Sequence, residues 1–118
     1  MKKKNSKKKV KNSSQKDFEI IKWKKYSKPK FEDIEKTIKK KGYIPHKIHF
    51  IFPNSHRAIS HNNKEIRVVL RGKIKFGCED KEFELKQGDG VLIKHRVAHY
   101  FKNPGNNRVI YVCGIKKS

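Results

Sequence analysis

The sequence contains no apolar run close to the ~18 residues that a membrane-spanning helix needs, which excludes a helical membrane protein. Only two cysteines, Cys78 and Cys113, occur in 118 residues. Two cysteines cannot form a disulfide framework or a four-cysteine zinc site. The basic start is not followed by an apolar segment, so it does not have the pattern of a secretory signal. We therefore expect a reduced, cytoplasmic chain with two inert thiols.

Acidic residues are also scarce, with 11 Asp and Glu against 32 Lys and Arg, which gives a formal net charge of +21 and a pI near 10.1. Residues 1–16 hold eight lysines and no acid, so they cannot bury enough apolar surface to offset their ordering entropy. We expect a disordered tail that binds nucleic acid or another polyanion weakly and without sequence preference, or one that only adds solubility. Lysine outnumbers arginine, which argues against bidentate reading of bases.

The rest of the chain predicts one helix followed by many short strands. Residues 17–26 alternate loosely and indicate an edge strand or docking arm, which we expect a second subunit to order. Residues 31–41 have apolar side chains at helical spacing, acids in the first turn and lysines in the last, before Gly42. After Gly42, short β-branched segments alternate with Gly, Asn and Asp turns, which is typical of a sandwich or small barrel.

The spacing of a few polar residues narrows this fold class. Glu65 stands seven residues before Gly72, and Gly88 is followed at fixed intervals by His99 and Asn103. This arrangement resembles the two-part signature of the cupin superfamily, G-x5-H-x-H-x3,4-E-x6-G and G-x5-P-x-G-x2-H-x3-N, over about residues 42–115. The alternative on pattern alone is another small basic barrel, such as an OB-fold with aromatic side chains for stacking bases.

Two positions of each half decide how complete the resemblance is. His61 stands four residues before Glu65, where the second histidine of the first half belongs, but Ile59 occupies the place of the first histidine. In the second half, Lys94 replaces the proline and Arg96 replaces the glycine. His56 and His95 lie near enough in sequence to replace the histidine that is absent at position 59.

The resemblance implies an all-β cupin-type jelly-roll barrel, usually dimeric. We expect a tail at residues 1–16, an arm and helix at 17–41, and the barrel at 42–118. It also implies that His61, Glu65 and His99 converge inside the barrel and bind a divalent metal. Two imidazoles and a carboxylate suit iron, manganese, nickel or zinc. The other interpretation is that the histidines hydrogen-bond Glu65 without metal. His46 and His49 are interpreted as ordinary strand residues of opposite parity.

Arg67 shares the parity of Glu65 and so points to the same face of a regular strand. A buried arginine is costly unless it is paired. Two interpretations stay open: Arg67 holds a carboxylate or phosphate substrate, or it forms an internal pair with Glu65 that excludes metal.

Three functions of different classes follow. The first is a metal-dependent dioxygenase, isomerase or lyase acting on a small polar or anionic molecule. The second is a non-catalytic cupin that binds a ligand or a partner, and the third is a nucleic-acid-associated protein acting through its tail. The sequence leaves open the substrate, the metal and whether the protein is an enzyme.

Overall fold

The structure is a computed structural model that describes residues 17–53, 56–59, 64–94 and 97–116, without the side chains of residues 56–59. The predicted tail, residues 1–16, lies outside the described residues. The described part contains one helix and nine strands: β2 (Phe18–Ile21), α2 (Phe31–Lys40), β3 (Ile44–Ile51), β4 (His56–Ile59), β5 (Glu65–Arg71), β6 (Ile74–Cys78), β7 (Lys81–Leu85), β8 (Gly90–Ile93), β9 (His99–Lys102) and β10 (Val109–Ile115).

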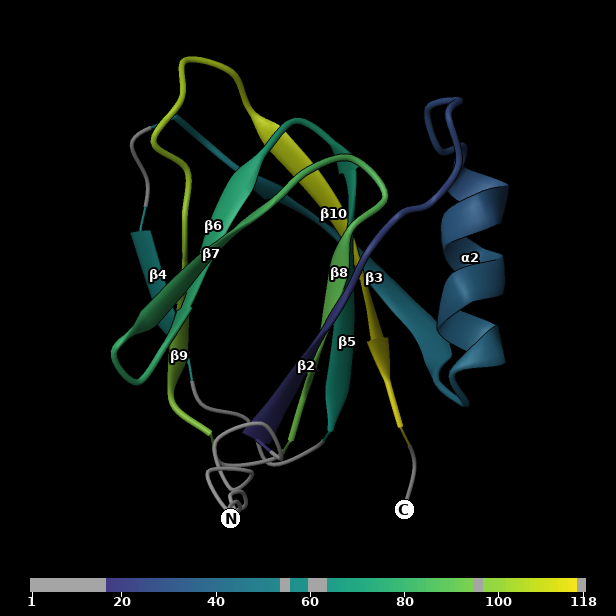
Figure 1. Cartoon of the computed structure of the whole chain (residues 1–118), viewed down its shortest axis with the longest axis horizontal. Helices are drawn as coiled ribbons and strands as arrows, with labels where there is room; N and C mark the ends of the chain where they lie inside the picture. The colour runs from purple at the N-terminus through teal and green to yellow at the C-terminus, as the bar shows by residue number, and fades with distance from the viewer. Residues whose placement is uncertain (1–16, 54–55, 60–63, 95–96, 117–118) are drawn as a thin grey trace, which may run out of the picture.

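The strands form two antiparallel sheets that face each other as a jelly roll (Figure 1). One sheet has the order β2-β8-β5-β10-β3 and the other has the order β4-β9-β6-β7. The predicted all-β fold is therefore confirmed, and the described part of the chain has one helix, as expected. β2 lies at one edge of the five-stranded sheet.

The core lies between the two sheets. It is built from inward side chains of both, including Phe76 and Phe101 of the four-stranded sheet and Val69, Val91 and Tyr111 of the five-stranded sheet, all 2% exposed or less. Alternation of side chains along each strand explains this arrangement, because every second residue points inward. A second apolar cluster covers the opposite face of the five-stranded sheet.

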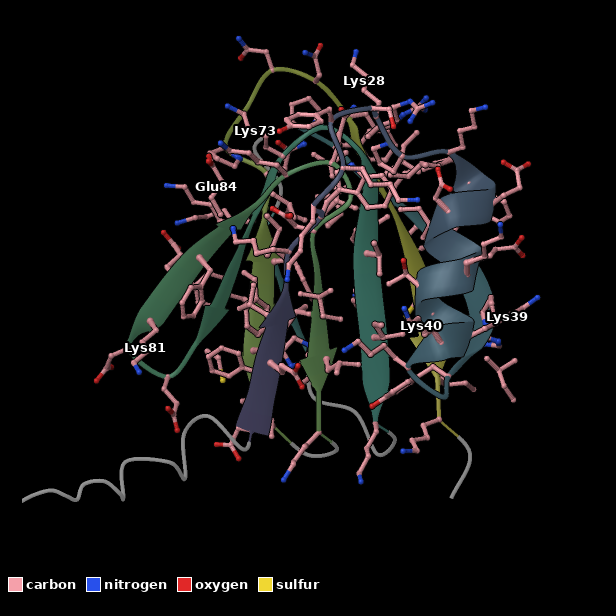
Figure 2. All side chains as sticks on the ribbon, turned by 45° about the vertical axis from the view of Figure 1, so that its right-hand side comes forward. Lys28, Lys39, Lys40, Lys73, Lys81 and Glu84 are labelled. Atoms are coloured by element: carbon pink, nitrogen blue, oxygen red, sulfur yellow. The ribbon has the colours of Figure 1, made fainter. Side chains whose placement is uncertain are left out.

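This second cluster is formed under α2, which lies outside the barrel (Figure 1). Ile34 and Ile38 of α2 are 1% and 0% exposed and pack with Ile66 and Val68 of β5. The Asp33 carboxylate accepts a hydrogen bond of 2.9 Å from the Lys30 backbone N–H at the start of the helix. Lys39 and Lys40 lie at its C-terminal end (Figure 2), where positive charges interact favourably with the negative end of the helix dipole.

The expected docking arm is shorter than predicted, because only Phe18–Ile21 forms a strand. β2 pairs with β8 of the same chain, in the register Phe18↔Ile93 to Ile21↔Gly90. The expectation that a second subunit orders this segment is therefore wrong. Phe18 also packs edge-on against Phe76, with ring centroids 5.3 Å apart, so the strand contributes to the barrel core.

The turn at Gly88 and Asp89 fixes the chain that follows β2. Asp89 is 5% exposed, and its carboxylate accepts hydrogen bonds from the backbone N–H groups of Trp23, at 2.9 Å, and Lys86, at 3.0 Å. The Trp23 ring lies against Gly88, whose φ of 89° favours glycine and where a Cβ atom would collide with the ring. The signature residue Gly88 and its neighbour Asp89 therefore have a structural role.

Candidate functional site

Polar side chains gather inside the barrel on the inner face of the five-stranded sheet. Glu65 and Arg67 come from β5, and Tyr111 and Cys113 come from β10, whose Cys113 lies directly opposite Arg67. The four residues are between 1% and 5% exposed. β5 and β10 each alternate, so the same strands that bury Ile66 and Val112 against α2 direct this polar set into the barrel.

The Glu65 carboxylate and the Arg67 guanidinium form a buried ion pair. Arg67 Nη2 and Nε lie 3.0 Å and 3.2 Å from Glu65 Oε1, and both donate hydrogen bonds to it. Cys113 Sγ lies 3.1 Å from the same oxygen and donates a third. Burial raises the pKa of the Cys113 thiol to about 12, an effect that Arg67 opposes and Glu65 reinforces. The thiol is therefore protonated at neutral pH and acts as a donor to Glu65 rather than as a nucleophile.

Aromatic side chains enclose the guanidinium of Arg67. Its Nη1 donates a hydrogen bond of 2.7 Å to the Tyr111 hydroxyl. Its Cζ lies 5.0 Å from the ring centroid of Phe101 and 5.2 Å from that of Tyr111, within the range of cation–π attraction. Burial alone lowers the pKa of Arg67, but the attraction of Tyr111, Cys113 and Glu65 raises it overall. Arg67 therefore keeps its charge inside the barrel.

His99 of β9 faces the same interior from the opposite sheet. It is 4% exposed, and its Nδ1 lies 2.7 Å from the carbonyl oxygen of Val97. A carbonyl can only accept, so this contact assigns the proton to Nδ1 and leaves the lone pair on the buried Nε2. The ring also packs against Phe76 and Phe101, at centroid distances of 6.0 Å and 5.6 Å.

Of the three predicted metal ligands, the structure places Glu65 and His99 in the barrel interior, whereas His61 lies outside the described residues. His95 also lies outside them, and His56 is described only by its backbone in β4. Ile59 of β4 is directly opposite His99 in the strand register. The absent first histidine would therefore have belonged to the strand next to His99. Within the described ranges, no group of three His, Cys, Asp or Glu side chains is arranged to hold a metal ion.

Sequence reasoning found Glu65, His99 and Arg67, but it missed their aromatic and thiol partners. Tyr111 and Cys113 carry no recognisable motif, and only the parity of β10 could have placed them on the inner face. The sequence predicts no special role for His49, a residue of β3, but its ring stacks on Tyr111 with ring centroids 5.3 Å apart. Asn103, the last signature residue, is 1% exposed and donates to the carbonyl oxygens of Ile51 and Asn107, so it fastens a turn.

A family model described as "Cupin domain" matches residues 48–115, more than half of the chain. The chain therefore belongs to the cupin domain family, as the spacing of its polar residues predicted. The matched segment includes β5, β9 and β10, which carry the polar cluster. No curated protein matches the chain.

Solved structures show the same fold at low sequence identity. The plu4264 protein from Photorhabdus luminescens has a TM-score of 0.57 and 19% identity, with 60% of each chain covered. A predicted oxalate decarboxylase from Thermotoga maritima has a TM-score of 0.57 and 21% identity, covering 70% of this chain and 74% of the other. The cupin domain of an XRE family transcriptional regulator from Enterobacter cloacae has a TM-score of 0.58 and 12% identity, covering 86% and 98%.

No helix in the described part of the chain combines the length and apolar character that crossing a membrane requires.

Proposed function

We propose that the barrel interior binds a small polar or anionic ligand together with a divalent metal ion. One observation carries this proposal: Glu65 and Arg67 form an ion pair inside the barrel, where they are only 5% and 3% exposed. His99 faces the same interior. A folded chain gains little stability from a buried ion pair compared with apolar side chains of the same size. A role in binding explains why the cluster is there.

The donor set supports a metal of the first transition row. Glu65 supplies a carboxylate, and His99 supplies a ring nitrogen. The carbonyl oxygen of Val97 fixes the tautomer of the His99 ring, as is common for metal-binding histidines. We propose His61 as the third ligand. Two imidazoles and one carboxylate suit iron, manganese, nickel or zinc. Such an ion would act as a Lewis acid toward a ligand bound beside it.

Arg67 favours an anionic ligand. Arg67 and Glu65 together carry no net charge, so a divalent ion in this buried space adds an excess of positive charge next to the guanidinium. A carboxylate or phosphate ligand would offset that charge, and Arg67 is the residue proposed to bind it. We therefore expect the metal and a small carboxylate to bind more tightly together than either does alone.

Metal analysis of untagged protein tests this proposal. The wild type should take up iron, manganese, nickel or zinc in up to one equivalent, and more completely with a dicarboxylate present. Glu65→Gln should abolish uptake. Glu84→Gln is the matched control, since Glu84 is an exposed carboxylate on β7 (Figure 2). Equal uptake by wild type and Glu65→Gln would contradict the metal site.

Ile59→His tests whether the site is a cupin metal centre that lacks one histidine ligand. If the interior is organised around a metal, a histidine opposite His99 should raise metal affinity at least ~10-fold.

The alternative function is a non-catalytic cupin that binds a ligand or a partner. This alternative is favoured because Arg67 already pairs with the Glu65 carboxylate that a metal ion would need as a ligand. Unchanged metal affinity in Ile59→His would select it.

Further parts of the proposal rest on composition. Residues 1–16 are proposed to bind nucleic acid or other polyanions weakly, so their removal should abolish that binding and leave ligand binding unchanged.

The family resemblance supports a homodimer. Cys78 and Cys113 are buried free thiols, which supports a reducing compartment such as the cytoplasm.

A further inference from the structure

Three lysines stand next to one another where β5 begins and where β8 and β10 end, at the lower end of the barrel in Figure 1. The strand register, continued by one residue, places Lys64 opposite Lys94 on one side and Lys116 on the other. The backbone N–H of Lys116 also donates a hydrogen bond of 3.1 Å to the Lys64 carbonyl oxygen. Like charges at directly opposite positions destabilise a sheet. The row of three ammonium groups is therefore unfavourable unless an anion accompanies it.

The three lysines surround a groove on the outer face of the five-stranded sheet. Side chains alternate along a strand, and Glu65 points into the barrel, so its neighbour Lys64 points outward. The groove has a volume of about 260 Å³, and its lining includes Tyr43, Leu92 and the three lysines. We call it the Tyr43 groove. It lies on the opposite side of the sheet from the polar cluster of the barrel interior, so it is a separate site.

The four-stranded sheet has a comparable pair of facing lysines, but with a carboxylate beside them. Lys75 and Lys102 are opposite each other in β6 and β9, and both contact Glu82, with N–O distances of 3.7 Å and 3.1 Å. In the Tyr43 groove, Glu19 supplies the only carboxylate among the described lining residues. No carboxylate of the described ranges lies within ion-pair distance of the three lysines. The charge that Glu82 balances on one sheet is therefore left unbalanced on the other.

Tyr43 adds a hydrogen-bond donor to the same groove. The residue is 9% exposed and packs in the apolar cluster under α2, and Lys116 Nζ lies 5.7 Å from the centroid of its ring. Burial, and to a smaller extent the charge of Glu19, raises the pKa of the Tyr43 hydroxyl, which therefore stays protonated. With respect to the residues that the structure describes, this hydroxyl makes no hydrogen bond. It can therefore donate one to an anion that the lysines attract.

We propose that the Tyr43 groove binds the phosphate group of a phosphate monoester. The three lysines and Glu19 give the groove two net positive charges, and a phosphate monoester carries about 1.5–2 negative charges at pH 7. Its three acceptor oxygens can contact several donors at once, which the single charge of a carboxylate matches less well. Leu92 and the Tyr43 ring supply apolar contacts for the organic part of the ester.

Two binding measurements on the full chain test the proposal and distinguish the sources of the phosphate. Calorimetric titration with phenyl phosphate at low salt measures binding of a free ester, and co-sedimentation with vesicles that contain phosphatidic acid measures binding of the same group on a lipid. Lys64→Gln should weaken binding about 3–5-fold, and Lys64→Gln with Lys116→Gln at least ~10-fold. Tyr43→Phe should weaken it about 3-fold or more through the lost hydrogen bond. An effect confined to one measurement identifies the source.

Lys81→Gln is the matched control, because Lys81 is an exposed lysine of β7, in the other sheet, and its loss changes the net charge equally (Figure 2). It should leave the affinity within about twofold of the wild type. Lys64 is exposed, so Lys64→Gln should keep or slightly raise the thermal transition as repulsion within the row falls. Absence of binding by the wild type, equal weakening by Lys81→Gln, or binding that persists in the double variant would overturn the proposal. Persistent binding would assign the ester to the barrel interior or to residues 1–16.

Discussion

The two faces of β5 are equally buried but are held by different forces. Ile66 and Val68 point outward under α2, whereas Glu65 and Arg67 point inward, and all four are 5% exposed or less. The outer face is stabilised by apolar burial, which depends on volume and tolerates similar side chains. The inner face depends on matched charges, so it tolerates a loss only when both partners change. Burial alone therefore does not distinguish the site from the core.

The largest expected effect comes from separating the buried charges. Arg67→Met leaves Glu65 buried without its guanidinium and should lower the free energy of unfolding by about 3–5 kcal/mol. Adding Glu65→Gln to this variant should recover part of the loss, because no uncompensated charge remains. Urea denaturation of the single and double variants measures both values. A loss below about 1 kcal/mol in Arg67→Met, the size expected for a solvent-exposed ion pair, would contradict an inner face that depends on matched buried charges.

A smaller effect is expected on the outer face. Ile38→Ala removes a side chain that is 0% exposed between α2 and β5, and it should cost about 2–4 kcal/mol through lost burial and a residual cavity. Ile38→Val should cost only about 0.5–1.5 kcal/mol. Urea denaturation again measures the change. Neither variant should alter metal or ligand binding, and a change in binding would link the two faces that we treat as separate.

The smallest effect sharpens the role of Cys113. Its thiol has a pKa raised to about 12 in the folded chain, against ~8.5 for an ordinary thiol. Stability from this difference is complete below about pH 8.5 and is lost as the pH rises toward 12. Between about pH 8 and pH 10, the wild type should lose about 1–2 kcal/mol more than Cys113→Ala. Parallel stability curves for the two proteins would contradict a protonated Cys113 that donates to Glu65.

The sequence determined the elements and the fold family. The spacing of Ile34 and Ile38 defined the helix, since residues four apart lie on one side of it. The intervals from Glu65 to Gly72 and from Gly88 to His99 identified the cupin barrel, because turns and inward positions recur at fixed distances along its strands. Parity placed Arg67 beside Glu65, since the side chains of a strand alternate with period two.

The tertiary structure decided what surrounds Arg67 in the folded chain: it is paired with Glu65 and enclosed by Phe101 and Tyr111. It also brought Cys113 to Glu65 across 48 positions of sequence, and it placed β2 and β3 at opposite edges of one sheet. Local sequence cannot encode these facts. They depend on strand order and register, which are set by the joint burial of segments far apart in the chain.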